Sequence, residues 1–400
     1  MAWVVRDAID SYLKSKLPVL PQGDHAKDAK QIKLKQMTKI FEKFEEKIRV
    51  LSLFSGCGGM DFGVELAGGH VIFSNDLLVD ACKTLKKYFP EADIRNEDIS
   101  GIAAFPDADV VVGGYPCQSF SMAGNRDPEK DERTNLYKQF LRVVSIVRPK
   151  YFVAENVSGL KQLSKGSFLK EQLDAYDKAG YNMSYQLVNA KDYGVPQSRK
   201  RLFIVGVRKD LNQRFEFPGA THGKETKATG PLKPYASHGD AIKGLPLWPE
   251  GEFYERPHDP EGHFSWYFMS RNRKANWADP AFTVVANWRH ITLHPASPVM
   301  TLTWSNLADG YKQRWDFSDQ YEHIEADPSR KKLEKARRLS WRECARIQTF
   351  SSKFVPAGDA ASKFTQIGNA VPPMLAKAIF AHLFTGAGLV DAMPSLDLKA

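Results

Sequence analysis

Cys117 stands in the stretch GGYPCQSFS, Gly113 to Ser121, directly after the apolar run ADVVVGG. The apolar run predicts a buried strand. The glycines and Pro116 that follow it predict a turn in which the backbone can approach a ligand closely. A partly ionised thiol there can act as a nucleophile. Most free cysteines are inert and buried, so Cys117 indicates a reactive site only together with other groups.

Glu155 and two arginines supply such groups. Glu155 lies near the end of the predicted strand YFVAENV, where its carboxyl group can face the same cleft as the thiol. A thiol beside a carboxylic acid suits addition to an electron-poor ring, because sulfur adds while the acid protonates a ring nitrogen. Arg199 and Arg201 of QSRKR point to one side of an extended segment and can hold a carbonyl, a phosphate or a carboxylate. The alternatives are a cap or surface ion pair for Glu155 and a solvated loop for the arginines.

The stretch FSGCGG, Phe54 to Gly59, predicts a ligand-binding turn between a strand and a helix. Its glycines allow close approach, and the helix N-terminus favours negative charge. Asp76, twenty positions after Gly56, ends the next strand, where a carboxylate can accept ribose hydroxyls. Asp98 and Ile99 end a third strand and suit an adenine amino group and ring. These features predict an adenosine-bearing cofactor, either NAD or S-adenosylmethionine, although both aspartates can also be helix caps.

Strand-like and helix-like stretches alternate from residue 49 to residue 214. This alternation predicts an α/β fold with a doubly wound sheet, which binds ligands at the carboxyl ends of its strands. The last two strands, YNMSYQLVNA and RLFIVGVR, are joined by a loop, so we expect an antiparallel hairpin at the sheet edge.

Changes in composition divide the chain into four predicted parts. Residues 1–48 are charged and form a helical extension packed on the main domain, with a DNA-touching arm as the alternative. Residues 49–214 form the catalytic and cofactor-binding domain. Residues 215–338, rich in Pro, Gly, Trp and His without a clear period, form a smaller irregular domain. Residues 339–400, with helical signals in SWRECARIQTF and PPMLAKAIFAHLF, return to complete the first domain.

The overall composition indicates a soluble globular protein, with 42% hydrophobic and 26% charged residues among 400. No apolar stretch is long enough to span a bilayer, and the charged start is unlike a secretory signal, so we expect an intracellular protein. The four cysteines have neither zinc-ligand spacing nor the density of a disulfide framework, which indicates reduced thiols and no metal site. The net charge of +9 is compatible with a polyanionic partner such as nucleic acid.

Six stretches occur in the order found in one enzyme family: FSGCGG, GGYPCQSFS, AENV, QSRKR, RECARIQTF and QIGNAVPP. Over residues 49–214 and 339–385 the chain resembles the DNA (cytosine-5) methyltransferases, of the bacterial restriction–modification type. The resemblance implies a Rossmann-like mixed sheet, the S-adenosylmethionine-dependent methyltransferase fold. It also implies that residues 215–338 are a target-recognition domain.

The resemblance assigns a reaction to the residues described above. The enzyme flips a cytosine out of duplex DNA, because the base is out of reach inside the helix. Cys117 then attacks C6, and Glu155 contacts and protonates N3. Arg199 helps to hold the base, and Arg201 supports the site. The activated C5 receives a methyl group from S-adenosylmethionine, and loss of the C5 proton releases the thiol.

The resemblance also implies binding residues. The segment from Ser119 to Asn135 resembles the mobile loop that closes over DNA in this family. Contacts with double-stranded DNA are expected from Gln118, Ser119, Arg271, Arg273, Arg289 and His290. Contacts with S-adenosylmethionine are expected from Phe54, Gly56, Gly58, Asp76, Asp98, Ile99, Pro116, Asn369 and Ala370.

A sequence-specific enzyme of this kind is expected in the cytoplasm as a monomer without membrane contact, protecting host DNA from a cognate restriction endonuclease. Three alternatives are weighed against it. A tRNA-methylating relative usually has a shorter variable region. A non-catalytic DNA-binding relative would not need Cys117, Glu155 and Arg199. An NAD-dependent oxidoreductase would leave the Pro116–Gln118 stretch unexplained.

Overall fold

The computed structural model describes residues 47–116, 136–160, 166–224, 231–253, 264–307, 310–322, 332–333 and 335–392. The prediction of a helical extension falls almost entirely on residues 1–46 and so lies outside the described residues. The described residues from Ile48 onward belong to one compact unit.

A seven-stranded sheet forms the centre of this unit, in the order β3-β2-β1-β4-β5-β7-β6. The strands β1 to β5 pair in parallel, whereas β7 is antiparallel to both β5 and β6. The α/β prediction and the antiparallel hairpin at the edge are therefore confirmed. The strand order reverses between β1 and β4, so a crevice is expected at their carboxyl ends. The strands are β1 (Arg49–Leu53), β2 (His70–Asn75), β3 (Asp93–Arg95), β4 (Val110–Gly113), β5 (Tyr151–Val157), β6 (Tyr181–Asn189) and β7 (Lys200–Arg208).

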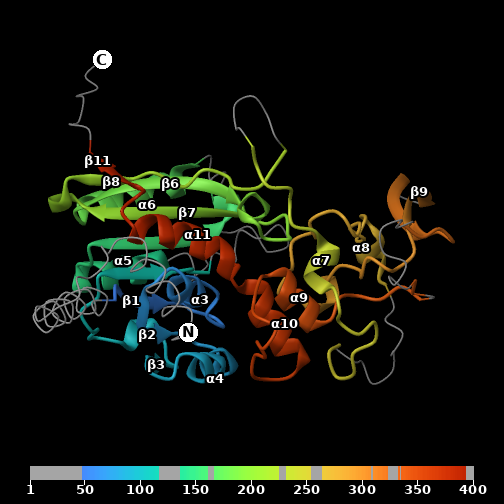
Figure 1. The fold of residues 1–400 in the computed structure, drawn as a ribbon, viewed down its shortest axis with the longest axis horizontal. Helices are drawn as coiled ribbons and strands as arrows, with labels where there is room; N and C mark the ends of the chain where they lie inside the picture. The colour runs from blue at the N-terminus through green and yellow to red at the C-terminus, as the bar shows by residue number, and fades with distance from the viewer. Residues whose placement is uncertain are drawn as a thin grey trace, which may run out of the picture. The chain divides into compact units, whose positions relative to one another are not determined.

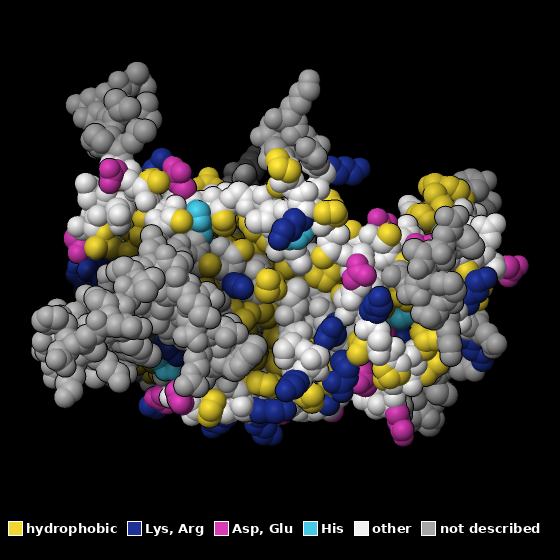
Figure 2. All heavy atoms as spheres, in the orientation of Figure 1, with side chains coloured by type: hydrophobic (Ala, Val, Ile, Leu, Met, Phe, Trp, Pro, Cys, Tyr) yellow, Lys and Arg dark blue, Asp and Glu magenta, His cyan; other side chains and the backbone are white. Residues whose placement is uncertain are grey.

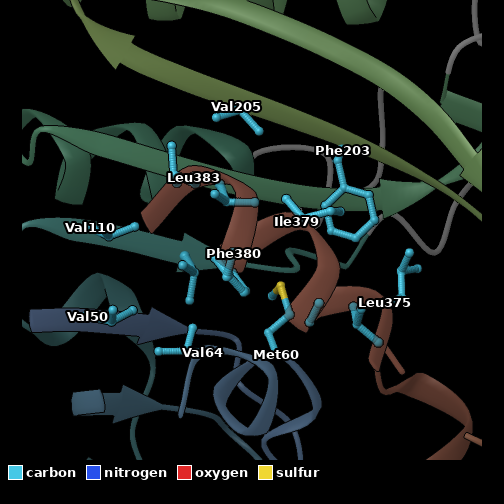
Figure 3. Packing of buried hydrophobic residues seen from close by; sticks show 14 of the residues in the cluster. Val50, Met60, Val64, Val110, Phe203, Val205, Leu375, Ile379, Phe380 and Leu383 are labelled. Atoms are coloured by element: carbon cyan, nitrogen blue, oxygen red, sulfur yellow. The ribbon is translucent and has the colours of Figure 1, made fainter. Parts of the chain in front are cut away.

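Helices cover both faces of the sheet and bury two apolar clusters. The first cluster lies against α3 and α11, with Val64, Phe203 and Phe380 among its members (Figure 3). The second lies against α5 and α6. Along β5, Val153 belongs to the first cluster and Phe152 to the second, as expected for a strand buried on both faces. These helices are α3 (Gly59–Leu66), α4 (Val79–Tyr88), α5 (Leu136–Val147), α6 (Ser167–Lys178) and α11 (Pro373–Phe384), with short 3-10 turns η1 (Ile99–Gly101), η6 (Ala190–Tyr193) and η7 (Lys209–Leu211).

The helix α11 comes from the end of the chain but packs beside α3, which follows the first strand (Figure 1). A Cβ atom at Gly63 would lie 2.3 Å from Cβ of Ala376, so only glycine allows the two helices this approach. The C-terminal segment thus completes the core of the sheet.

Residues 215–338 contain more regular structure than the composition predicts. An antiparallel pair of strands and several short helices lie there, to the right of the sheet in Figure 1. The elements are α7 (His238–Ile242), α8 (Trp266–Met269), η8 (Trp288–His290), β9 (Met300–Leu307) and β10 (Gly310–Phe317); β8 (Gln213–Phe215) pairs with β11 (Leu389–Asp391).

A third apolar cluster joins this region to the next two helices, α9 (Trp341–Ile347) and α10 (Ala360–Asn369). Ala281 and Ile291 lie in it together with Cys344 and Ile367. The residues after 338 therefore belong to two cores. The helices α9 and α10 pack against residues 215–338, here called the smaller region, whereas α11 packs on the sheet. The proposed boundaries at 214/215 and 338/339 stay predictions. None of the helices in the described part of the chain is long and apolar enough to cross a membrane.

Candidate active site

The turn after β1 has an unusual backbone. Gly56 and Gly58 have positive φ angles of 55° and 84°, which glycine adopts without steric cost. Phe54 has a φ of 53°, which is costly for a side chain of this size and marks a constrained position. A Cβ atom added at Gly56 would meet no atom within 4 Å, so open space borders the turn. The turn can therefore admit a ligand near its backbone.

Asp76 ties this turn to the end of β2. Its Oδ2 accepts a hydrogen bond from the backbone N–H of Gly56 at 2.8 Å, and its Oδ1 accepts one from Leu78 at 2.8 Å. Burial raises the pKa of Asp76, and these backbone donors oppose the rise. Leu77 is 66% exposed beside it. A carboxylate next to exposed apolar surface suits the ribose and base of a nucleoside.

Asp98 and Ile99 follow β3 in different environments. Asp98 is exposed, and its Oδ1 accepts hydrogen bonds from the backbone and the hydroxyl of Ser100, at 2.7 and 2.6 Å. These bonds cap η1 and lower the pKa of Asp98. Ile99 is buried in the second apolar cluster. The capping role that the sequence left open for Asp98 is present, and the cofactor role of both residues stays a prediction.

Asp61, a fully buried carboxyl group on α3, is not among the site residues predicted from the sequence. Ser52 donates to its Oδ1 at 2.6 Å and Ser74 to its Oδ2 at 3.0 Å, while Ser55 donates to Ser52 Oγ at 2.8 Å. Burial raises the pKa of Asp61 to about 6. The serines link this carboxyl group to the turn that carries Phe54. An acidic residue on the apolar face of a predicted helix was the available signal.

Glu155 on β5 forms an ion pair with Arg201 on β7, whose Nε lies 2.8 Å from Oε1. The antiparallel register places Arg201 opposite Val157, two residues beyond Glu155. Burial raises the pKa of Glu155, and the charges of Arg201 and Arg199 oppose this rise. The pair thus holds a buried carboxyl group at the carboxyl end of the parallel strands, where its protonation is easier than in water.

The segment that leads to Cys117 begins beside this pair. Gly113 on β4 pairs with Ala154 on β5, and a Cβ atom at Gly114 would lie 3.0 Å from Oε2 of Glu155. A side chain at position 114 would therefore crowd the carboxyl group. Pro116, half-buried, is the last described residue before the gap. The predicted site residues Cys117, Gln118 and Ser119 lie outside the described residues.

Arg199 is almost fully buried and has a different environment from Arg201. Its Nη1 donates to the backbone oxygen of Val284 at 2.8 Å, and its Nη2 donates to that of Gly368 at 2.9 Å. These contacts connect β7 with the smaller region and with α10. The resemblance implies that Arg199 holds the base and that Arg201 supports the site; in the structure Arg201 forms the ion pair with Glu155.

The end of α10 lies against the turn after β1. A Cβ atom at Gly59 would come within 3.0 Å of Ala370 Cβ and 2.3 Å of the backbone oxygen of Val371. Asn369, next to Ala370, is exposed. The structure thus brings together two groups of predicted cofactor residues, Phe54–Gly58 and Asn369–Ala370, that are more than 300 positions apart.

The four predicted DNA-contacting residues of the smaller region differ in exposure. Arg271 and Arg289 are exposed, and His290 is half-buried with its ring edge-on to Tyr267. Burial and the positive charges of nearby arginines lower the pKa of His290. Arg273 is buried, and its Nε donates to the backbone oxygen of Phe268 at 3.0 Å. Its guanidinium thus contacts the fold, and a contact of Arg273 with DNA stays a prediction.

Comparison with known proteins points to one family. Residues 48–385 match the family model described as C-5 cytosine-specific DNA methylase. The chain is 37% identical to the type II methyltransferase M.BsuRI of Bacillus subtilis, over 90% of this chain and 85% of the relative. It is also 37% identical to M.BspRI of Lysinibacillus sphaericus, over 84% and 81%.

Solved structures show the same fold at lower sequence identity. The methyltransferase EhMeth of Entamoeba histolytica superposes with a TM-score of 0.56 at 17% identity, covering 86% of this chain and 99% of that one. The Dnmt2 methyltransferase of S. pombe gives a TM-score of 0.55 at 16% identity, over 86% and 99%.

Proposed function

Because the chain belongs to the C-5 cytosine-specific DNA methylase family and is a DNA cytosine-5 methyltransferase of the restriction–modification type, we propose that it methylates one cytosine within a short duplex sequence by cysteine catalysis. The observation that carries this proposal is the ion pair between Glu155 and Arg201, 2.8 Å apart, beside the start of the segment that bears Cys117.

S-adenosylmethionine is the proposed cofactor, and the residues around the turn after β1 fit it. When bound, it supplies an electrophilic methyl group to the base. Asp76 can accept hydrogen bonds from the ribose hydroxyls through the lone pairs that Gly56 and Leu78 leave available. The open space beside Gly56 allows a ligand to approach the backbone. Phe54 and Asn369 complete the proposed contacts from the two chain segments that meet there.

Glu155 is the proposed acid for the target cytosine. As the Cys117 thiolate forms a bond to C6, negative charge develops on the ring, and a proton given by Glu155 to N3 neutralises it. Burial favours the protonated form of Glu155, which suits this role. Arg201 fixes the orientation of the carboxyl group. After C5 has been methylated, the C5 proton is lost to solvent, Cys117 leaves as the thiolate, and the N3 proton returns to Glu155, which restores the ring.

Double-stranded DNA is the proposed substrate, contacted by Gln118, Ser119, Arg271, Arg289 and His290. Lys and Arg side chains also gather on the face shown in Figure 2, over α4 and the α9–α10 region. Together with a net charge of +9, they attract a polyanion. The two relatives named above, M.BsuRI and M.BspRI, are type II methyltransferases. We therefore propose a cytoplasmic enzyme that protects host DNA from a cognate endonuclease cutting the same site.

Base-resolution mapping of 5-methylcytosine tests the proposal. Unmethylated DNA is incubated with the protein and S-adenosylmethionine, in parallel with the Cys117→Ser variant. We expect methylation at one short motif with the wild-type protein and none with the variant. Methylation by Cys117→Ser at the wild-type rate would refute cysteine catalysis, and methylation scattered over unrelated sequences would refute a single recognition site.

A further inference from the structure

The segment Ala281–Ala286, called the strap here, connects the smaller region with the catalytic strands. Ala281 exchanges two backbone hydrogen bonds with the β6–β7 connection, through Ser198 N–H at 2.8 Å and Pro196 oxygen at 2.9 Å. Thr283 Oγ1 donates to the backbone oxygen of Ser198 at 2.7 Å. The strap therefore runs along the segment that continues into Arg199 and Arg201.

The other side of the strap lies against the end of α10. A Cβ atom at Gly368 would come within 2.3 Å of the backbone nitrogen of Ala286, so no larger residue fits between them. Thr365 Oγ1 also lies 3.4 Å from the backbone oxygen of Ala286. The strap is thus held between the catalytic strands and the segment that carries Asn369.

Two buried glutamines bind the three segments together. Gln197 Oε1 accepts from the backbone N–H of Val284 at 2.8 Å, and its Nε2 donates to Gln348 Oε1 at 2.9 Å. Gln348 Nε2 donates to the backbone oxygens of Ile367 and Ala370, at 2.8 and 3.2 Å. Both glutamines are completely buried, and every oxygen and nitrogen of their amide groups has a partner.

Arg199 adds a second connection at the same point of the strap. Gln197 accepts from the N–H of Val284, and Arg199 donates to its C=O. Both polar backbone groups of one strap residue are therefore held by side chains from a single extended segment. A shift of the strap would break both bonds and leave buried polar groups unpaired, which is unfavourable.

We propose that Gln197 and Gln348 are positioning residues that set the Glu155–Arg201 pair and the Asn369 segment against the strap, so that methyl transfer depends on the placement of residues 215–338. The inference rests on the proposed function. Gln197 lies four residues before Arg201. Gln348 donates to the carbonyls of Ile367 and Ala370, which lie before and after Asn369 in the chain. Neither side chain reaches solvent, so each acts through the groups it holds.

The test compares three variants with a matched control. Gln348→Glu keeps the size of the side chain but removes the donor to two carbonyls, and Gln197→Ala breaks the same network from its other side. The double variant Gln197→Ala/Gln348→Glu combines the two substitutions and completes a double-mutant cycle. Gln366→Ala is the control, because Gln366 is also buried but bonds to Thr84 and Ala357, away from the strap. For each protein, kcat is measured at saturating DNA and S-adenosylmethionine, together with the Kd for duplex DNA and the unfolding temperature.

We expect the single variants to lower kcat at least about tenfold, because a displacement of an ångström at a reacting centre costs up to about a hundredfold. Their Kd for DNA and unfolding temperature should change no more than those of Gln366→Ala. The double variant should lose less than the product of the single losses, since the two side chains share one network. If the variants of Gln197 and Gln348 have the same kcat as Gln366→Ala, the inference is wrong but the proposed function is unaffected. Absence of methylation by the wild-type protein would overturn the proposed function and the inference with it.

Discussion

Arg201 on β7 forms an ion pair with the carboxyl group of Glu155 on the neighbouring strand β5, and 2.8 Å separates Nε from Oε1. The charge of Arg201 opposes the rise in the pKa of Glu155 that burial causes. The two residues therefore determine together how readily the proposed acid is protonated at neutral pH.

Replacing Arg201 by glutamine should slow methylation and change its pH dependence. Loss of the positive charge raises the pKa of Glu155 further. Since the protonated carboxyl group is the active form, the alkaline limb of the kcat profile should move to higher pH. Loss of orientation should lower kcat by about a hundredfold, as removal of a positioned acid–base partner does. Steady-state rates between pH 6 and pH 10 measure both effects, and an alkaline limb that stays in place would count against the assignment.

Replacing Asp76 by asparagine should weaken cofactor binding. The amide can still accept from one backbone donor, but it loses the charge that favours ribose hydroxyls, and hydrogen bonds to charged groups contribute about 1.5–3 kcal/mol. The Kd for S-adenosylmethionine should therefore rise at least tenfold, as measured by calorimetry. Asp98→Asn is a useful comparison, because Asp98 already caps η1 with its Oδ1. An unchanged Kd in Asp76→Asn would remove Asp76 from the cofactor site.

Replacing Asp61 by asparagine should change how stability depends on pH. The pKa of Asp61 is about 6 in the folded protein, above its ordinary value of 3.8. The protonated carboxyl group of Asp61 therefore contributes fully to the free energy of unfolding below pH 3.8, and this contribution is lost as the pH rises through 6. The difference in unfolding free energy between Asp61→Asn and the wild type should grow in favour of the variant between pH 4 and pH 7, by roughly 2–3 kcal/mol. Denaturant unfolding at several pH values measures it, and a constant difference would contradict the buried carboxylate.

Replacing Arg271 and Arg289 by alanine should reduce the salt dependence of DNA binding. Each lost phosphate contact lowers the slope of log K against log salt by about 0.9. Binding should weaken to a similar extent on specific and unrelated duplexes if both residues contact phosphates. Titrations of labelled duplexes at several salt concentrations measure this slope. Arg273→Ala differs in its expected effect, because buried Arg273 supports α8 and its loss should lower thermal stability instead.

The sequence predicted the doubly wound sheet and its antiparallel edge hairpin, because strand–helix alternation is a local signal. The roles of the motif residues stay predictions. The sequence predicted neither Asp61 nor the glutamine pair, since their roles arise from partners that fold next to them from distant positions. Gln348 lies 151 positions after Gln197 and looks like an ordinary polar residue near the end of a helix. The relative roles of Arg199 and Arg201 likewise depend on which side chain reaches Glu155, and residue types alone do not decide that.

The packing of α11 against α3 has a consequence for biosynthesis. Residues of α11 complete the apolar cluster that β1 and α3 begin, although the two ends are separated by most of the chain. A ribosome synthesises α11 more than 300 residues after α3, so the face of the sheet that α11 covers stays incompletely buried until α11 has emerged. Contacts between such distant residues also slow folding. A nascent chain should therefore acquire protease resistance, and with it methylating competence, only after α11 has emerged from the ribosome.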